Sequence, residues 1–314
     1  MDPVEDTSRS EGPLIVGLGM SILDHLIEVE EFPRRTGVTA SRGSNLMGGG
    51  PVATALCAAA ALGARVTMLD RLADDWRGDL LRAEYRTRGV DIEHLKVHPG
   101  GRSSMATVMV RRRDGERHII YEVGDSPPLT SDDLPEATLR QAAWLHMNGR
   151  HLSACLSAAR HVRAGGGRVS FDGGANRYEA ATEALYPWID VLVVARDYAE
   201  RLAESLDRHT QLQHLARWGA ELVGITDGAQ GSWFATSDGE PFHQKAFAAG
   251  PVRDTTGCGD VFHGALLFAR QRGDDWHSCA RFASAAAAWA ATALGGRGHL
   301  PKAAEVEALI GPPL

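Results

Sequence analysis

The amino-acid sequence predicts an α/β fold with a mostly parallel central sheet, and two observations support this prediction. Short apolar runs with the length of buried strands alternate with stretches of helical periodicity. This alternation is typical of βαβ units, in which helices cover both faces of a parallel sheet. The 314 residues contain no repeat, low-complexity segment or linker, so we expect a flexible tail over residues 1–12 and a single domain over 13–314.

The domain is expected to begin with a strand, a helix and a second strand. Residues 13–19 (PLIVGLG) are an apolar run closed by glycine, as in a buried strand. Three glycines at 48–50 precede an alanine-rich segment over 51–62, which starts with proline and is followed by glycine. Proline in the first turn and glycine just beyond the last turn mark the two ends of a helix. Residues 65–69 then predict a strand, and 78–88 an amphipathic helix.

Two β-rich segments predict a small antiparallel sheet that forms a lid on the core. Residues 104–110 and 116–122 are strand-like runs joined by Asp114-Gly115, a dipeptide that favours a hairpin turn. We place the lid segments near residues 27–46 and 98–123. The remaining strands of the core are expected at residues 144–147, 168–172, 191–194 and 222–226.

Composition argues against several classes of protein. The formal net charge of −7 and the pI near 6.0 disfavour a general nucleic-acid-binding protein, which needs a basic face. The four cysteines are far apart and form no CxxC pair, so we expect a reducing, cytoplasmic environment. Residues 1–12 lack the apolar segment of a signal peptide, and the alanine-rich run 283–294 is too short to span a bilayer. No membrane partner is therefore expected.

The segment DTTGCGDVFHGA, which starts at Asp254, carries the strongest chemical signal. Its glycines allow a tight turn that exposes successive backbone N–H groups, and a helix is expected to begin directly behind them. A helix N-terminus with free amides binds anions. Asp260 would face the bound anion, where a kinase needs a carboxylate to accept a hydroxyl proton. The simpler alternative is a glycine-rich turn in which Asp260 caps the helix.

Three further features could contribute to a ligand site near the same edge of the sheet. Gly49 and Gly50 precede the first helix, where the backbone can approach a ligand closely, although such glycines are often only a tight turn. Asp24 follows the first strand, and a carboxylate there can accept hydrogen bonds from sugar hydroxyls; a solvated turn is the alternative. Arg150 follows the strand at 144–147 and could reach a ligand or lie at the surface.

Two nucleotide-binding patterns are excluded, and a third loop is left open. The run GLGMSILD over residues 17–24 has Ile22 where a dinucleotide fingerprint needs its third glycine. No GxxxxGK[ST] segment occurs, which excludes a P-loop. The loop TDGAQGS follows the strand at 222–226. It is either an ordinary turn or a second phosphate-binding loop that acts through Thr226 and Gly228.

Together, the two glycine motifs closely resemble the signatures of the ribokinase/PfkB family of carbohydrate kinases. DTTGCGDVFHGA is similar to the C-terminal signature and GGGPVATALCAAAALGA to the N-terminal one, and GITDGAQGS and LGGRGHLP agree in their order. The resemblance spans residues 14–309. It implies a ribokinase-like three-layer α/β/α sandwich with a small β-sheet lid that often forms a dimer interface. It also implies a kinase that uses ATP and Mg²⁺ to phosphorylate a sugar.

The resemblance further implies roles for individual residues. Asp260 matches the general base. The family's anion hole, which stabilises the transferring phosphoryl group, is matched here by Gly257, Cys258 and Gly259. The positions that match acceptor binding are Asp24, Gly49, Gly50, Thr54 and Arg150. The positions that match nucleotide binding are Thr226, Gly228, Gly231, Thr256 and Gly259. A monovalent cation such as K⁺ near Asp254 is a further expectation.

Within the family, the sequence is most similar to two branches. WLHMNGRHLSA resembles ketohexokinases, and GGGPxATA with GGRxxxP resembles bacterial kinases of 6-deoxy-6-sulfofructose. We therefore expect a ketose-like acceptor, with sulfofructose, a nucleoside or a sugar acid as alternatives. The chain departs from the wider family at Pro51, at Thr54 and at residues 195–198, where an NxxE motif is usual. These departures motivate a second hypothesis, a catalytically idle sensor that binds a sugar or nucleoside.

Overall fold

The central sheet contains eight strands in the computed structural model, which describes residues 12–311. The predicted tail over 1–12 lies, except for Gly12, outside the described residues. The strand order is β14-β13-β12-β11-β10-β9-β1-β4, and every strand from β12 to β4 in this order is parallel to its neighbours within that group. The strands are β1 (Leu14–Leu18), β4 (Arg65–Leu69), β9 (Trp144–Met147), β10 (Arg168–Gly173), β11 (Val191–Ala195), β12 (Leu222–Thr226), β13 (Ser232–Thr236) and β14 (Phe242–Gln244).

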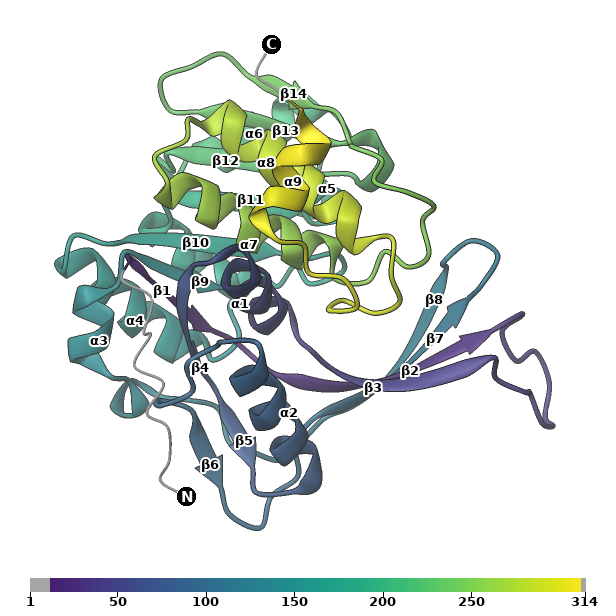
Figure 1. The fold of residues 1–314 in the computed structure, drawn as a ribbon. Helices are drawn as coiled ribbons and strands as arrows, with labels where there is room; N and C mark the ends of the chain where they lie inside the picture. The colour runs from purple at the N-terminus through teal and green to yellow at the C-terminus, as the bar shows by residue number, and fades with distance from the viewer. Residues whose placement is uncertain (1–11, 312–314) are drawn as a thin grey trace.

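Helices cover both faces of this sheet and form the two outer layers (Figure 1). One apolar core contains side chains of α1 (Pro51–Leu62), α7 (Cys258–Gln271), α8 (Trp276–Ala290) and α9 (Ala303–Ile310). The other contains side chains of α3 (Glu136–Gln141), α4 (Leu152–Ala164), α5 (Arg196–Ala203) and α6 (Arg208–Ala216). Successive strand residues point to opposite layers, so Ile15 joins the first core and Val16 the second. The predicted three-layer sandwich is confirmed.

Helix α1 has the predicted boundaries. Pro51 occupies its first turn, and Gly63 ends it in a left-handed conformation (φ 111°), with its N–H donated to the carbonyl oxygen of Ala60. Nearly all of its residues are buried, because it lies between the sheet and α7. Small alanine side chains allow the two helices to pack closely: a Cβ added at Gly264 of α7 would lie 2.2 Å from the carbonyl oxygen of Ala55.

A second sheet of four strands forms the predicted lid, which projects from the body of the molecule (Figure 1). Its order is β3 (Gly43–Gly49), β2 (Ile22–Val29), β7 (Met105–Arg111) and β8 (Arg117–Glu122). The β7–β8 hairpin is antiparallel, as predicted, but the expectation of a fully antiparallel lid is wrong because β2 and β7 are parallel. The chain leaves the lid through α1 and β4 before it returns, and such a long crossover permits parallel pairing.

The chain between β4 and the lid adds two elements. Helix α2 (Trp76–Thr87) covers the predicted helical segment, and the unpredicted strands β5 (Arg71–Ala73) and β6 (Lys96–His98) form a short parallel pair. Three 3₁₀ segments complete the described elements: η1 (Ser131–Asp133), η2 (Ala180–Trp188) and η3 (Gly228–Gln230). Within the described residues, no helix is both long and apolar enough to cross a membrane.

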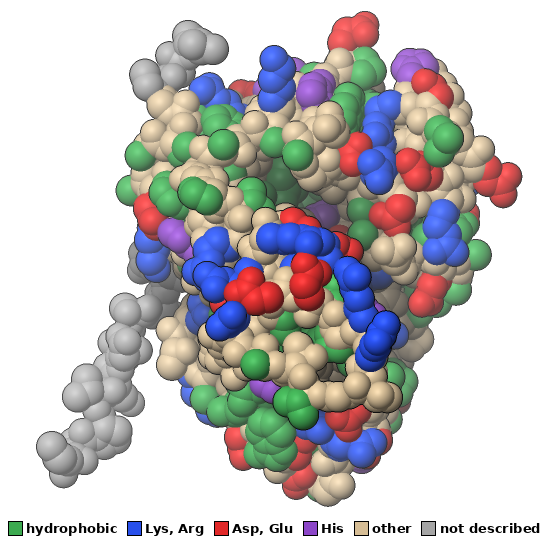
Figure 2. Space-filling model, turned by 90° about the vertical axis from the view of Figure 1, so that its right-hand side faces the viewer, with side chains coloured by type: hydrophobic (Ala, Val, Ile, Leu, Met, Phe, Trp, Pro, Cys, Tyr) green, Lys and Arg blue, Asp and Glu red, His purple; other side chains and the backbone are tan. Residues whose placement is uncertain are grey.

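The inner and outer faces of the lid differ in burial. Leu26 and Val108 are paired neighbours on one face, and they pack with Met47 and with Leu294 from the core. The tip of the lid is charged, and Figure 2 shows basic and acidic side chains gathered side by side on the face toward which the lid projects. There Arg111 pairs with Glu116, and Arg113 with Glu31.

Candidate active site

The first functional element is the N-terminus of α7. Gly257 adopts a left-handed conformation (φ 73°), and a Cβ atom there would lie 2.5 Å from the Cα atom of Gly296. This tight turn lets α7 begin at Cys258, and the N–H groups of a first helical turn have no acceptor within the helix. The space beside Gly259 is open, since an added Cβ would meet nothing within 4 Å. Backbone N–H groups and the helix dipole can therefore hold an anion here.

Asp260 lies in this first turn and is partly buried. Burial raises the pKa of its carboxyl group, and repulsion from Asp172 raises it further. Attraction to Arg177 and His263 opposes the increase but does not cancel it. A carboxylate with a raised pKa is a better proton acceptor near neutral pH than an ordinary one. The predicted base therefore lies at the same helix end as the open amides.

A buried polar cluster lies behind Asp260. Asp172 is the second-last residue of β10, and its Oδ1 is 3.3 Å from Nε2 of His263, which lies one turn after Asp260 in α7. The rings of His263 and His146 have centroids 5.3 Å apart, and Nδ1 of His146 is 3.2 Å from the hydroxyl oxygen of Ser170. Burial alone would raise the pKa of Asp172, but attraction to His263, a hydrogen bond with that ring and attraction to Arg177 together outweigh burial and lower the pKa. Burial lowers the pKa of His146 to about 3, so this ring is neutral.

Asp24 and the glycine loop before α1 form the opposite end of the site. A Cβ atom added at Gly49 would lie 2.2 Å from Oδ2 of Asp24, and one at Gly50 would lie 2.1 Å from the carbonyl oxygen of Met20. Burial raises the pKa of Asp24 to about 7; attraction to a buried arginine opposes this increase, and repulsion from Asp260 adds to it. Asp24 lies against Gly49 just before α1, and Asp260 lies at the start of α7, which packs against α1, so the fold brings two distant predicted carboxylates into one region.

The buried arginine is Arg297, whose side chain is 0% exposed. Its Nη2 donates to the carbonyl oxygen of Gly49 at 2.9 Å, and its Nε donates to the hydroxyl oxygen of Thr54 at 3.2 Å. Its Nη1 lies 3.6 Å from Oε1 of Glu84, and the guanidinium carbon is 5.5 Å from the ring centroid of Tyr85. The predicted residue Thr54 thus lies beside the glycine loop with its hydroxyl engaged by Arg297.

The loop before α7 is held from both the core and the lid. Buried Asp254 accepts hydrogen bonds through Oδ1 from the N–H and hydroxyl of Thr256, at 2.8 and 2.7 Å, and through Oδ2 from the N–H of Gly295 at 2.8 Å. From β8, Arg117 donates to the hydroxyl of Thr255 at 2.8 Å. Residues 12–311 contain no group of three or more acidic, histidine or cysteine side chains that could hold a metal. The cation expected near Asp254 stays a prediction.

The second predicted phosphate loop follows β12 directly. Thr226 is the last residue of the strand, and Gly228 has a positive φ of 51° with nothing within 4 Å of an added Cβ. Gly231 has a φ of 87°, and a Cβ there would lie 2.2 Å from the carbonyl oxygen of Gln244. Asp227 fixes the loop by ion pairs with two arginines, each at 3.0 Å. These arginines are Arg196 and Arg208.

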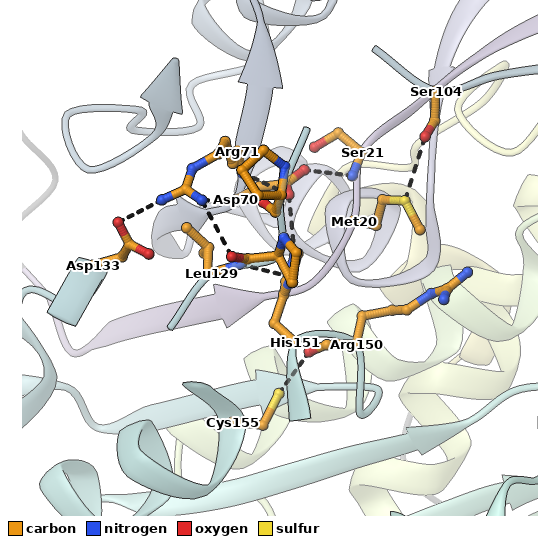
Figure 3. Close-up of polar contacts among 12 residues, drawn as sticks. Met20, Ser21, Asp70, Arg71, Ser104, Leu129, Asp133, Arg150, His151 and Cys155 are labelled. Carbon is orange, nitrogen blue, oxygen red and sulfur yellow. Dashed lines mark hydrogen bonds and ion pairs between the residues drawn. The ribbon is translucent and has the colours of Figure 1, made fainter. Parts of the chain in front are cut away.

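Arg150 is exposed at the carboxyl end of β9. Figure 3 shows its side chain pointing away from Asp70 and His151. His151 adopts a left-handed conformation (φ 58°), and its Nε2 lies 3.4 Å from Oδ1 of Asp70. Oδ2 of Asp70 accepts a hydrogen bond from the N–H of Ser21 at 2.6 Å. The buried carboxylate of Asp70 therefore connects His151, the residue after Arg150, to the turn that leads into β2 and Asp24.

Several charged residues of this region were not singled out by the sequence motifs. Asp172 ends a predicted strand at the same sheet edge as Asp24, which is a usable signal. His263 follows Asp260 by three residues, so helical spacing places both on one face. Arg297 lies in the quoted segment LGGRGHLP, but no local pattern indicates that its guanidinium is buried.

An α/β/α sandwich, a lid and a helix N-terminus beside a carboxylate together define a kinase of the ribokinase type. Comparison with known proteins identifies the family. The chain matches the model of the pfkB family carbohydrate kinases over residues 13–303, so it belongs to this family and is a carbohydrate kinase, as predicted.

Individual relatives cover most of the chain. Ketohexokinase from Mus musculus is 25% identical over 278 residues, which cover 85% of this chain and 92% of that protein. Aminoimidazole riboside kinase from Salmonella typhimurium is 30% identical over 276 residues, which cover 81% and 84%. The structure of Arabidopsis thaliana ribokinase complexed with ribose and ATP has a TM-score of 0.82 at 25% identity, covering 95% of this chain and 99% of that one. These similarities confirm the predicted fold.

Proposed function

We propose that this kinase transfers the γ-phosphoryl group of ATP to a primary hydroxyl of a sugar or sugar derivative, most favourably a ketose. The observation that carries the proposal is the placement of Asp260 in the first turn of α7, whose N–H groups have no acceptor within the helix, with Asp24 at the glycine loop before the adjoining helix α1. One carboxylate binds the acceptor, the other removes its proton, and the amides bind the phosphoryl charge. Gly257, Cys258 and Gly259 supply those amides.

The chemical step follows from these positions. Asp24 and the backbone at Gly49 and Gly50 orient the acceptor, because an ionised carboxylate accepts hydrogen bonds from hydroxyls. Asp260 accepts the proton of the attacking hydroxyl as its oxygen forms a bond to the γ-phosphorus. The bond from that phosphorus to the bridging oxygen of ADP breaks at the same time. The N–H groups at the start of α7 stabilise the negative charge on the phosphoryl oxygens, and Asp260 later releases its proton to solvent.

The residues present fit a nucleoside triphosphate. Gly228 leaves open space at the end of β12, next to Thr226, and Gly231 and Thr256 shape the two loops that would face the phosphates. Arg117 contacts the loop before α7. Mg²⁺ in kinases is bound largely through phosphate oxygens, with one or two carboxylates, and it neutralises phosphate charge. The fit therefore needs no metal cage built from protein side chains alone.

A ketose is the favoured acceptor because a relative named ketohexokinase aligns over 85% of this chain. A ketose presents a primary hydroxyl next to further hydroxyls that Asp24 can bind. Arg150, at the carboxyl end of β9, is proposed to contact the acceptor. A relative named aminoimidazole riboside kinase keeps a nucleoside as an alternative, together with sulfofructose and a sugar acid.

The decisive variant is Asp260→Asn. It keeps the shape of the side chain but cannot accept the hydroxyl proton, so kcat should fall by about a thousandfold or more while ATP still binds. ADP formation with D-fructose and ATP binding by calorimetry measure the two effects. Asp274→Asn, at the other end of α7, removes a carboxylate that pairs with Arg272 and should leave kcat unchanged. A folded Asp260→Asn protein with near-normal turnover would overturn the assignment.

An acceptor panel tests the substrate class. Purified protein with ATP and Mg²⁺ is incubated with ketoses, aldoses, nucleosides, sugar acids and sugar phosphates, and ADP formation is recorded. We expect the highest kcat/KM with a ketose. Thermal stabilisation by a sugar without ADP formation on any member would instead support a sensor. Activity confined to nucleosides would overturn the ketose assignment and retain the kinase.

We further propose a cytoplasmic homodimer that forms through the outer face of the lid. Leu46, His25, Thr107 and Ile120 lie in register across its four strands and therefore share one face. Leu46 is 43% exposed and Ile120 is 57% exposed, so the two outer strands of this face each present an exposed apolar side chain in one copy. The four free cysteines fit a reducing compartment.

A further inference from the structure

Arg297 is the largest fully buried side chain of the described residues, and it lies beside the acceptor end of the site. Burial of a guanidinium is unfavourable unless the charge is paired and its donors are hydrogen-bonded. Its Nη2 and Nε are bonded to the carbonyl oxygen of Gly49 and the hydroxyl of Thr54. Arg297 therefore ties together the start of the glycine loop and the first turn of α1.

Glu84 of α2 holds the other side of this arrangement. Its Oε1 is 3.6 Å from Nη1 of Arg297, and its Oε2 accepts a hydrogen bond from the N–H of Gly48. Arg88, which directly follows α2, pairs with Glu84 at 2.6 Å and donates to the carbonyl oxygen of Arg297 at 3.2 Å. Strand β3 is thus bound to α2 and to the loop before α9 at the point where it becomes the glycine loop.

The segment that carries Arg297 also contacts the phosphate end of the site. The N–H of Gly295 donates to Asp254, and the backbone of Gly296 lies against Gly257 so closely that no Cβ would fit at 257. Three consecutive residues therefore contact the loop before α7 and the loop before α1. A displacement of Arg297 would change the relative position of these two loops.

Charge adds a second effect on Asp24. The charged groups that act on its carboxyl are Arg297, which favours ionisation, and Asp260, Glu84 and Asp254, which oppose it. Arg297 is the positive member of this set. An opposite charge close to a buried aspartate lowers its pKa by about 1 to 3 units. Only the ionised carboxylate can accept hydrogen bonds through both of its oxygens.

We propose that Arg297 is a positioning residue for the acceptor, which fixes the loop from Gly49 to Thr54 and supplies a positive charge beside Asp24, without touching the acceptor itself. The proposal rests on the proposed function, because it assumes that Asp24 and this loop bind the acceptor. It predicts that loss of Arg297 changes the KM for the acceptor and the pH dependence far more than the KM for ATP.

Three variants separate the two effects of Arg297. With D-fructose and ATP, Arg297→Met should raise the acceptor KM by about tenfold or more. It should also move the acidic limb of kcat/KM upward by about 1 to 3 pH units, because the pKa of Asp24 rises. Arg297→Lys keeps the charge but cannot make both hydrogen bonds, so it should raise the KM and leave the limb near its original pH. Glu84→Gln removes an opposing charge and should move the limb to lower pH.

Arg281→Met is the matched control, because Arg281 donates to the carbonyl oxygen of Ile310 in α9, away from these loops, and should change neither quantity. A folded Arg297→Met protein would overturn the proposal if its acceptor KM were normal and the acidic limb of its kcat/KM profile stayed at the same pH. Equal increases in both KM values would also overturn it. If Arg297→Met does not fold, a normal acceptor KM in Arg297→Lys, or a pH dependence of kcat/KM in Glu84→Gln that does not move to lower pH, would overturn the proposal.

A ligand-free measurement separates this proposal from the proposed function. Amide hydrogen exchange in peptides that cover residues 48–54 should be faster in Arg297→Lys than in the unchanged protein, and unchanged in Arg281→Met. If no sugar is phosphorylated but exchange accelerates, the proposed function fails and the positioning role stands. If sugars are phosphorylated and exchange does not change, the positioning role fails alone.

Discussion

At the scale of single residues, Asp24 and Gly49 lie closer together than a side chain at position 49 would permit. The backbone of Gly49 is not in the left-handed region, so space rather than conformation requires glycine. The carboxylate fills the volume that a Cβ would take. This contact gives a direct test of whether the Asp24 carboxylate must lie in this position for the acceptor to bind.

Gly49→Ala should displace the Asp24 carboxylate and raise the KM for D-fructose by about tenfold or more, with a smaller change in the KM for ATP. Steady-state kinetics with each substrate varied in turn measures both. Gly43→Ala lies in the same strand, where an added Cβ meets nothing within 4 Å, and it should have no effect. Equal KM values in the two folded variants would contradict the placement of the acceptor at Asp24.

At the scale of elements, α7 begins at a turn that only glycine can form. Gly257 combines a left-handed backbone with direct contact to Gly296, so two independent constraints fix the direction of the first N–H groups. Helix α7 packs against both α1 and α8 along its length. The helix that carries the proposed base is thus packed on two sides, and the turn at Gly257 sets the direction of its first N–H groups.

Gly257→Ala should reduce kcat by about a hundredfold or more, because removal of one oxyanion-binding donor commonly has an effect of that size. Gly89→Ala is a matched control: Gly89 has the same φ of 73°, but an added Cβ there meets nothing within 4 Å. It should cost about 1 kcal/mol of stability and leave kcat unchanged. Chemical denaturation and turnover assays distinguish the outcomes. Similar losses of kcat in both variants would mean that backbone strain, rather than the anion site, explains the effect.

The accuracy of the sequence predictions follows burial. The segments at 51–62, 65–69, 144–147 and 222–226 are buried on both sides, so their apolar runs were clear, and their boundaries are confirmed. Strand β3 (GSNLMGG) is mostly exposed and contains three glycines, so it shows no alternation, and the sequence predicts only a lid segment near residues 27–46 without the bounds of this strand. The parallel pairing of β2 with β7 depends on contacts between distant segments, which local patterns do not encode.

At the scale of the whole molecule, the lid joins the two ends of the site. Arg117 reaches Thr255 from β8, and Arg253 lies 3.4 Å from Glu28 of β2. The inner face of the lid is packed on the core, which leaves the outer face for a second copy. A lid that is shared between two copies would couple their closure, since each would be covered by strands from both.

Ile120→Glu should convert a homodimer into monomers, because a charge at this exposed apolar position cannot be buried in an interface without a partner. Light scattering over a range of protein concentrations measures the mass. Leu206→Glu, at an 82% exposed position in the loop between α5 and α6, is the control and should leave the mass unchanged. A monomeric unchanged protein, or an unchanged mass in Ile120→Glu, would contradict a dimer through the lid.

The site was less predictable from sequence than the fold, for a physical reason. Asp24 and Asp260 could be proposed because each follows a turn at the end of a recognisable element. Asp172, His263 and Arg297 act through burial and through mutual charge, which depend on the packing of β10, α7 and the loop before α9. A motif indicates which residues are present, whereas the tertiary fold determines their ionisation.

The raised pKa of Asp24 has a thermodynamic consequence for sugar binding. With a pKa of about 7, this carboxyl carries a proton in about half of the ligand-free molecules at neutral pH. Hydroxyls that donate to the carboxylate favour its charged form, so an uncharged sugar should displace up to about half a proton into the buffer. Calorimetric heats of sugar binding at pH 7 should therefore differ between phosphate and Tris, whose ionisation enthalpies differ. Binding of an uncharged sugar would then depend on pH, and its affinity would become weaker as the pH falls.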